Sequence, residues 1–389
     1  MCADQTKPSV RSAVDAFVVM DVMREANRLE AEGRSIMHLE VGQPGAPTPA
    51  TVRAVASETL DTGPLAYTDA LGLPSLRARI ANYYAEHHSV TLDPERVIVT
   101  AGSSAAFILT FLACFEEGDR VGVPEPGYPA YRNTLQALGC DPVSIPVGPD
   151  TDWVLTPDLI DQAEAQNGRL KGVLVASPSN PTGAMLTSPQ MAALVTHNEA
   201  ADRWFLSDEI YHRITYGQPD VSALGAGNDA IVINSFSKYY CMTGWRLGWA
   251  IVPERLVRPI ERLAQNLFIS APTLSQVAAE RAFDETDCLD ENVAVYAENR
   301  RLLLEELPKA GITSFAPADG AFYLYADVSH LTDDSAAFCA AMLKEAGVAA
   351  TPGADFDPTH GHRHVRFSFA GKTAEMAEAA RRLQAWLDP

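Results

Sequence analysis

Short apolar segments alternate with segments of helical pattern between about residues 50 and 290 of this chain. Five of these apolar segments are four or five residues long, and they cover residues 97–100, 120–123, 172–176, 204–207 and 231–234. Apolar strands that alternate with helices are typical of a mostly parallel sheet that is covered by helices on both faces. We therefore expect an α/β fold for this part of the chain.

Polar side chains follow four of these segments, close to the point where each predicted strand ends. They are Ser103, Asn180, Asp208 and Ser235. In open α/β sheets, ligands bind in the crevice outside the carboxyl ends of the strands. We therefore expect these four side chains to lie around one binding site.

Residues 235–248 combine two serines, a lysine and an arginine, namely Ser235, Ser237, Lys238 and Arg246. A lysine amine can form an imine with an aldehyde. Serine hydroxyls and a guanidinium can hold a phosphate, the latter through two parallel charge-assisted hydrogen bonds. Pyridoxal phosphate (PLP) carries both groups, so the segment favours a PLP site, although an ordinary surface loop remains open from these residues alone.

The charge balance argues against nucleic acid and anionic membranes as partners. The chain has 30 Lys+Arg and 50 Asp+Glu residues, a net charge of −20, and such a surface repels polyanions. No apolar run approaches the ~20 residues of a membrane helix, and the first residues show no secretory signal. The six cysteines are scattered without a CxxC pair, which is typical of reduced thiols in a cytosolic protein. We expect a cytoplasmic protein.

Metal binding is not expected from the sequence. His360, His362 and His364 alternate in a polar segment, which is compatible with a metal in principle but is more often an ordinary loop. The spacing of the cysteines matches no zinc pattern.

Several motifs, taken together in their order and spacing, resemble those of the fold-type I, class I/II aminotransferase family, nearest its bacterial aspartate- and aromatic-type branch. The resemblance extends from about Ala13 to the C-terminus. The motifs are residues 235–248, Tyr67-x4-Gly72-x3-Leu76-Arg77, Ser177-Pro-Ser-Asn180-Pro-Thr-Gly183, Ser207-Asp208-Glu209-Ile210-Tyr211, Gly320-Ala-Phe-Tyr323 and Arg366-x-Ser368-x-Ala370.

This resemblance implies a large PLP-binding domain, whose mostly parallel seven-stranded sheet lies between helices, and a smaller α+β domain. We place an N-terminal arm, which also contributes to the small domain, at residues 1–45, the large domain at 46–290 and the small domain at 291–389. The expected helices at the two ends span residues 14–33 and 373–387. The family also implies a homodimer with shared active sites.

The resemblance assigns catalytic roles to three residues. Lys238 would hold the cofactor as an imine and move a proton at the substrate α-carbon. Asp208 would pair with the protonated pyridine nitrogen, and Tyr211, with Asn180, would bond the phenolic oxygen. The residues by themselves leave simpler alternatives open, because Asp208 also suits a helix N-cap and Asn180 also suits a turn.

The remaining residues would bind the phosphate, the ring or the substrate. The predicted phosphate ligands are Ser235, Ser237, Arg246, the backbone N–H groups of Ser103 and Ser104 at a helix start, and Tyr67 from the neighbouring subunit. Tyr128 would lie over the ring. Arg366 would bind the substrate α-carboxylate, with Asn180 and the backbone of Gly42 close by. A loop tyrosine at 67 and an outward arginine at 366 are the simpler alternatives.

The predicted substrate is a neutral amino acid. Aspartate-specific relatives place a cation near the substrate side chain, whereas here Ser104 and residues 265–270 supply none and residues 17–20 are apolar. An unpaired carboxylate in such a pocket is costly. We therefore predict a PLP-dependent aminotransferase that transfers an amino group between an apolar or aromatic L-amino acid and a 2-oxo acid in two half-reactions. A C–S β-lyase is the alternative, and aspartate transamination is less expected. A transcription-regulator module is disfavoured by the acidic charge.

Overall fold

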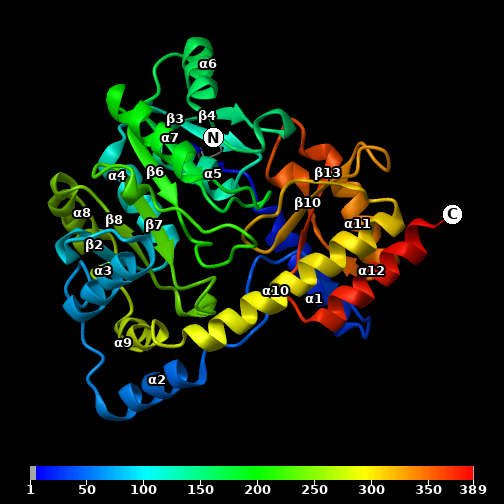
Figure 1. The fold of residues 1–389 in the computed structure, drawn as a ribbon, viewed down its shortest axis with the longest axis horizontal. Helices are drawn as coiled ribbons and strands as arrows, with labels where there is room; N and C mark the ends of the chain where they lie inside the picture. The colour runs from blue at the N-terminus through cyan, green and yellow to red at the C-terminus, as the bar shows by residue number, and fades with distance from the viewer. Residues whose placement is uncertain (1–5, 389) are drawn as a thin grey trace, which may run out of the picture.

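A central sheet of seven strands forms the larger part of the molecule (Figure 1). The computed structural model describes residues 6–388, so the first five residues of the predicted arm and Pro389 of the predicted small domain lie outside the described residues. The sheet has the strand order β2-β8-β7-β6-β5-β3-β4. The strands are β2 (Val97–Thr100), β3 (Arg120–Glu125), β4 (Asp141–Pro146), β5 (Gly172–Ala176), β6 (Trp204–Asp208), β7 (Ile231–Ser235) and β8 (Gly248–Ile251).

The sheet is mostly parallel, as the alternation of strands and helices predicts. Neighbours from β4 to β7 pair in parallel, whereas β8 runs antiparallel to both β2 and β7. The five predicted strands are confirmed, but β4 and β8 were missed. β4 lies at the sheet edge, contains two prolines and exposes alternate residues, so it lacks the continuous apolar run of a central strand.

Helices cover both faces of this sheet because successive strand residues point to opposite sides. Val97 and Val99 of β2 pack in one core cluster, whereas Ile98 between them packs in the other. The first face is covered by helices such as α3 and α7, and the second by α4, α5 and α8. The α-helices are α1 (Val18–Ala31), α2 (Ala50–Thr62), α3 (Pro74–His88), α4 (Ser103–Cys114), α5 (Pro129–Leu138), α6 (Pro157–Asn167), α7 (Ser188–Ala200), α8 (Glu254–Leu267), α9 (Thr273–Ala282), α10 (Thr286–Glu306), α11 (Ser335–Glu345) and α12 (Thr373–Leu387).

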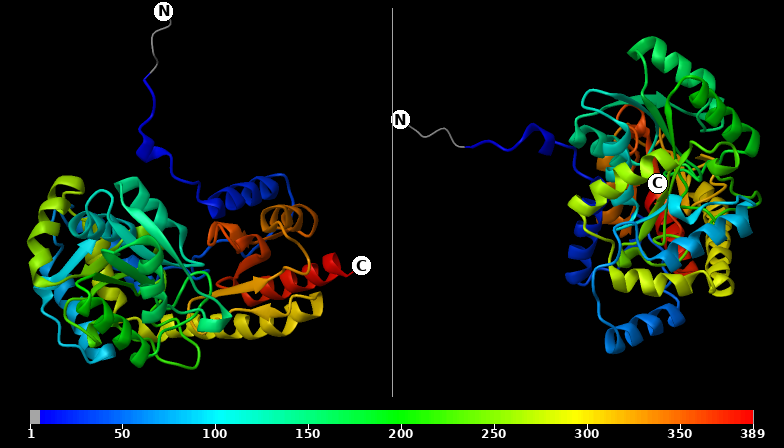
Figure 2. Two further views of the ribbon diagram at one scale, coloured as in Figure 1. Left: turned by 90° about the horizontal axis from the view of Figure 1, so that it is seen from above. Right: turned by 90° about the vertical axis from the view of Figure 1, so that its left-hand side faces the viewer.

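A smaller sheet follows in the last third of the chain. Its antiparallel strands have the order β12-β13-β10-β9, and α11 packs beside it. The strands are β9 (Ser314–Phe315), β10 (Tyr323–Asp327), β12 (Thr351–Pro352) and β13 (His364–Ser368). The pair β1 (Met37–His38) and β11 (Val348–Ala349) joins the N-terminal segment to this part of the molecule. The exact domain boundaries stay a prediction, and α10 crosses the predicted boundary after residue 290 as it extends from beside α9 toward α12 (Figures 1 and 2).

One predicted helix differs from the one observed, and the alternative role of Asp208 as a helix N-cap is not adopted. The N-terminal helix begins at Val18 rather than near residue 14, and the carboxylate of Asp355, from a distant segment, accepts a hydrogen bond of 3.3 Å from the Val18 amide. No helix starts directly after Asp208 in the described chain; a turn follows instead, in which the Asp208 side chain accepts a hydrogen bond of 3.1 Å from the Ile210 amide. None of the helices within residues 6–388 is long and apolar enough to cross a membrane.

Candidate active site

A cavity of about 480 Å³ opens where the carboxyl ends of the parallel strands face α1 and the smaller sheet. Most of the residues predicted from the sequence lie around it. Those that line it are Gly42, Ser103, Ser104, Tyr128, Asn180, Asp208, Tyr211, Ser237, Lys238, Arg246 and Arg366. Tyr67 and Ser235 are not among the lining residues of the described chain. Segments that are far apart in the sequence thus meet at one site.

Lys238 reaches into this cavity from the turn that follows β7. Its Nζ donates a hydrogen bond to the carbonyl oxygen of Gly42, and it lies 5.6 Å from the centre of the Tyr211 ring. Burial lowers the pKa of this amine to about 8, and the positive charges of Arg366 and Arg246 act in the same direction. About a tenth of the amine is therefore uncharged at pH 7, far more than for an ordinary lysine, and the uncharged form is the one that can act as a base or nucleophile.

Asp208 is the last residue of β6 and is almost fully buried. Its carboxylate accepts hydrogen bonds from the Tyr131 hydroxyl and the Ile210 amide. Burial raises the pKa of Asp208 to about 6, although those hydrogen bonds and the charge of Lys238 oppose the rise. The group is thus mostly ionised at neutral pH and can hold a cationic ring nitrogen.

Arg366 of β13 is buried between aromatic rings. Its guanidinium carbon lies 4.3 Å from the ring centre of Tyr323 and 4.7 Å from that of Phe356. Nη1 donates to Asn180 Oδ1 at 2.9 Å, and Nη2 donates to the carbonyl oxygen of Glu40. Nε is buried and has no hydrogen-bond partner among the described residues. Because this buried guanidinium is positively charged and lines the cavity, it favours an anionic ligand at this end.

The opposite end of the cavity is formed by Arg246 and the start of α4. Arg246 Nη1 donates to the carbonyl oxygen of Thr243 at 3.0 Å. Gly102 immediately precedes the helix, and a Cβ atom at this position would lie 2.6 Å from Arg246 Nη2. The absence of a side chain therefore lets the guanidinium lie beside the first amides of the helix, where the helix dipole also favours an anion.

The three other predicted phosphate ligands occupy different places. Ser237 lines the cavity, whereas Ser235 lies behind it, with its Oγ 2.9 Å from Ser237 Oγ and 3.0 Å from the carbonyl oxygen of Leu247. Tyr67 is 79% exposed. Direct binding of a phosphate by Ser235 or Tyr67 stays a prediction.

Two tyrosines of the site were not given a role by the sequence analysis. Tyr131 holds Asp208, and the Tyr323 hydroxyl forms a hydrogen bond of 2.7 Å with that of Tyr211. Tyr323 belongs to one of the motifs quoted above, but its partner is 112 residues away in the chain. The motif that contains Tyr323 was thus the sequence signal for this residue, whereas its contact with Tyr211 depends on the tertiary fold.

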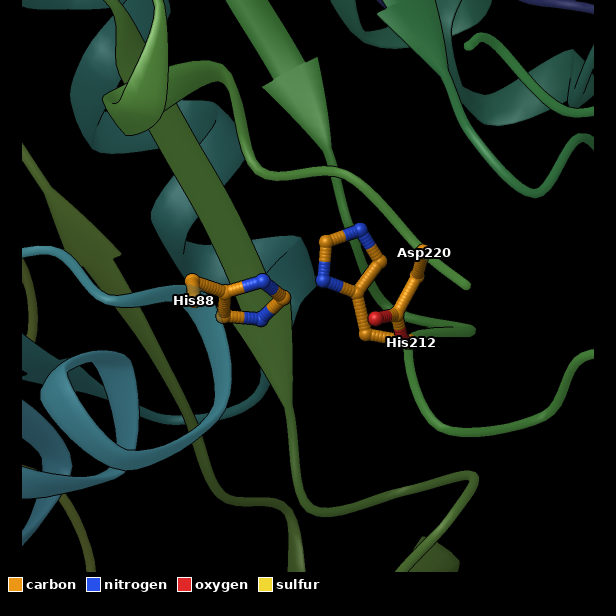
Figure 3. Close-up of side chains that lie close together, drawn as sticks. All are labelled: His88, His212 and Asp220. Atoms are coloured by element: carbon orange, nitrogen blue, oxygen red, sulfur yellow. The ribbon is translucent and has the colours of Figure 1, made fainter. Parts of the chain in front are cut away.

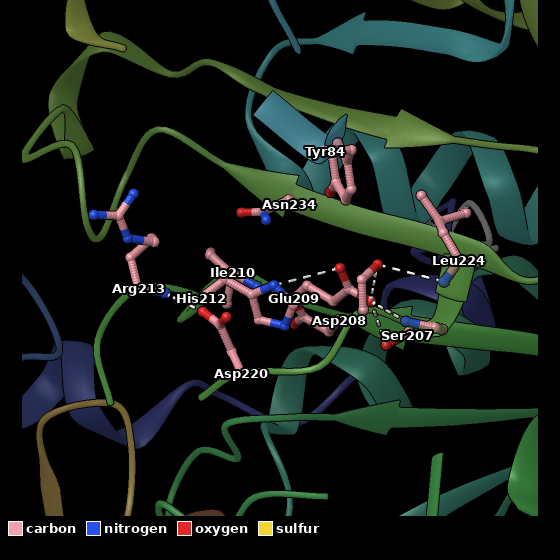
Figure 4. A network of polar contacts seen from close by, with 12 residues as sticks. Tyr84, Ser207, Asp208, Glu209, Ile210, His212, Arg213, Asp220, Leu224 and Asn234 are labelled. Carbon is pink, nitrogen blue, oxygen red and sulfur yellow. Dashed lines mark hydrogen bonds and ion pairs between the residues drawn. The ribbon is translucent and has the colours of Figure 1, made fainter. Parts of the chain in front are cut away.

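A second buried carboxylate, that of Glu209, follows Asp208 in the chain (Figure 4) and is not among the described residues that line the cavity. One oxygen of Glu209 accepts hydrogen bonds from the Ala223 amide at 2.8 Å and from the hydroxyls of Ser222 and Ser207. The other oxygen lies 3.5 Å from Nδ1 of His212. This network fixes the backbone on both sides of Asp208.

Comparisons with known proteins agree on one family. The model described as "Aminotransferase class I and II" matches residues 34–383. A valine–pyruvate aminotransferase of Mycobacterium tuberculosis is 47% identical over 383 residues, which cover 97% of this chain and 98% of the relative. A (5-formylfuran-3-yl)methyl phosphate transaminase of Methanocaldococcus jannaschii is 32% identical, with 96% of this chain and 97% of the relative covered.

Solved structures give the same result for the fold. The crystal structure of an aminotransferase from Mycobacterium tuberculosis superposes with a TM-score of 0.96 at 46% identity, covering 98% of this chain and 99% of that one. The aspartate aminotransferase of Thermus thermophilus with maleate superposes with a TM-score of 0.92 at 29% identity, covering 98% and 100% of the two chains.

The lowered pKa of Lys238 can be tested in cofactor-free protein. We expect the amine to lose its proton near pH 8, and Arg366→Gln to move the midpoint upward because a neighbouring positive charge is removed. Arg79→Gln, at an arginine that is not among the cavity-lining residues, should leave it unchanged. The pH dependence of trace acetylation at Lys238, read by mass spectrometry, measures the midpoint. A value near the ordinary ~10.4 would contradict the prediction.

Proposed function

Because this chain belongs to the class I and II aminotransferases, which are PLP-dependent and transfer an amino group between an amino acid and a 2-oxo acid, we propose that its amino donor is a neutral, apolar amino acid. Valine with pyruvate as the acceptor is the pair that we put forward first. The relative from Mycobacterium tuberculosis carries those two substrates in its name. The named relatives are transaminases, which supports transamination over the β-lyase alternative.

The lining of the cavity carries the substrate proposal. Its cations are Lys238, Arg246 and Arg366, with no others among the described lining residues. Each has a proposed role at the cofactor or at the α-carboxylate, so none remains for a side-chain carboxylate. The wall formed by α1 and the residue before it is apolar instead and consists of Phe17, Val19, Met20 and Met23.

The residues of the cavity suit pyridoxal phosphate. One end of the cavity is an anion-binding site formed by Arg246 and the start of α4, with Gly102 between them. Asp208 supplies a buried carboxylate for a cationic ring. When bound, PLP supplies an aldehyde carbon that takes up the amino group and a pyridinium that withdraws electrons from the substrate α-carbon. The Ser237 hydroxyl would contribute to this anion-binding site, with Ser235 behind it.

The side chains around the ring then have separate tasks. Lys238 moves the proton at the substrate α-carbon, for which its amine must be uncharged. Asp208 keeps the ring nitrogen protonated, and Tyr131 holds that carboxylate in place. Tyr211 and Asn180 would bond the phenolic oxygen and Tyr128 would lie over the ring, since all three side chains line the cavity.

Arg366 fixes the orientation of the substrate. Its guanidinium, which lines the cavity, would bind the α-carboxylate through charge-assisted hydrogen bonds. The backbone of Gly42, whose carbonyl oxygen already accepts from Lys238, lies at the same end. A carboxylate held here would direct the substrate side chain toward α1.

We also propose a homodimer in which Tyr67 completes the partner's phosphate site. Tyr67 and Leu65 are 79% and 50% exposed, and the segment before α1 extends away from the body of the molecule (Figure 2). Exposed apolar groups of this kind are typical of an interface. Sedimentation of the cofactor-loaded protein should give twice the chain mass of 42.0 kDa, and a fully active monomer would refute the dimer.

The function is tested by single half-reactions of the cofactor-loaded enzyme. With valine, we expect conversion of the cofactor to its amine form and release of the 2-oxo acid, at least about tenfold faster than with aspartate. Lys238→Ala should lower the rate by a thousandfold or so, since proton transfer contributes about 10²–10⁴. Lys372→Ala, at an exposed lysine, is the control. Faster turnover of aspartate would overturn the substrate proposal, and release of ammonia from the donor would indicate a lyase.

A cation placed at Ser104 should change the donor preference. Ser104 is exposed in the cavity, so Ser104→Lys can reach a side-chain carboxylate without displacing the core. We expect the ratio of kcat/KM for aspartate over valine to rise about tenfold, equivalent to ~1.4 kcal/mol. Ser104→Gln has comparable reach without charge and should leave the ratio near its original value. An equal change in both variants would show that charge does not select the donor.

A further inference from the structure

Three potential metal ligands converge on the other side of the Asp208 strand end, outside the cavity lining (Figure 3). His88 is the last residue of α3, His212 lies in the turn after β6, and Asp220 lies in the following loop. One ligand atom from each lies within 4.8 Å of the others. Figure 3 shows the two imidazole rings facing each other, with the Asp220 carboxylate beside His212.

The two histidines lack the hydrogen-bond partners that buried rings normally have. His212 is only 3% exposed, and neither of its ring nitrogens has a partner among residues 6–388. The buried Nε2 of His88 is likewise unpaired within the described chain. Buried polar atoms are rarely left unsatisfied in folded proteins. A ligand that accepts electron pairs from both rings would account for them.

From this geometry we propose that His88, His212 and Asp220 bind one divalent ion of the zinc class. Imidazole nitrogen and carboxylate oxygen are ligands that Zn²⁺ takes in tetrahedral sites, and a water can complete the fourth position. His88 and Asp220 are only partly buried, which gives the ion and the water a route from solvent.

Glu209 supplies the outer contact that such sites usually contain. A metal-bound histidine commonly donates its second N–H to a carboxylate, which orients the ring. His212 Nδ1 lies 3.5 Å from the oxygen of Glu209 that has no hydrogen-bond partner within the described residues. With Nδ1 directed to Glu209, Nε2 of His212 is the nitrogen left for the ion.

The charges around the cluster suit a bound cation. Asp220 and Glu209 supply two carboxylates, and the backbone amide of Arg213 donates to the former. The Arg213 guanidinium pairs with Asp290, at 3.2 Å, and lies over the ring of Tyr239. The ion would therefore join the end of α3 to the loop behind Asp208 and stabilise both.

Metal content tests this proposal independently of transaminase activity. The full-length, tag-free, cofactor-loaded protein is treated with a chelator and equilibrated with Zn²⁺. We expect one zinc per chain, with affinity lowered at least about tenfold in His88→Gln and Asp220→Asn. His360→Gln is the matched control, because His360 belongs to the exposed histidine segment and not to the cluster. Uptake that is equal in His88→Gln and His360→Gln, or no uptake, would overturn the proposal.

Cobalt in place of zinc reports the ligands directly and does not require a variant. The unmodified protein with Co²⁺ should show the visible bands of a low-coordinate nitrogen–oxygen site, without thiolate charge-transfer absorption. Thiolate bands would assign the ion to a cysteine, and the absence of visible bands would refute the site.

Zn²⁺ should also raise Tm by several degrees in the unmodified protein and in His360→Gln, but not in Asp220→Asn, because an ion that binds only the folded state stabilises it. Circular dichroism confirms that each variant is folded.

Discussion

Parallel pairing of β5, β6 and β7 sets the positions of the residues on which the site depends. Ala176 pairs with Asp208, and Asp208 pairs in turn with Ile233 of the next strand. This register brings the ends of three strands to one edge, so Asp208 at the end of β6 lies between the loops that carry Asn180 and Lys238. A slip of one residue would turn the Asp208 side chain to the other face of the sheet. The chemistry of the cavity thus rests on backbone hydrogen bonds that involve none of its reactive groups.

Burial then gives these groups their reactivity. The chain carries a net charge of −20, yet its cavity gathers three cations around one ionised carboxylate. Desolvation and mutual repulsion lower the pKa of Lys238, while desolvation raises that of Asp208. The excess of positive charge is arranged in two places, Arg246 at one end and Arg366 at the other. Such a cavity favours a ligand set with two anionic groups, as a phosphate-bearing cofactor and an amino acid provide.

The site also requires the two ends of the chain to meet. Arg366 near the C-terminus donates to the carbonyl oxygen of Glu40, and Lys238 from the large sheet donates to that of Gly42. The pairing of β1 with β11 holds this N-terminal segment in place. The apolar side chains of α1 can therefore form a wall of the cavity, although they precede its catalytic residues by almost two hundred positions.

The sequence by itself determined the α/β class, five of the seven strands of the main sheet, and the residue types that gather at their ends, because these follow from local patterns and from motifs of fixed spacing. The positions of Lys238, Asp208 and Arg366 around one cavity agree with that prediction. Only the tertiary structure decided the hydrogen bond of Tyr131 to Asp208, the turn that follows Asp208, and the meeting of His88 with His212. Those features arise from contacts between segments that are distant in the chain, and no local pattern encodes which distant side chain fills a given space.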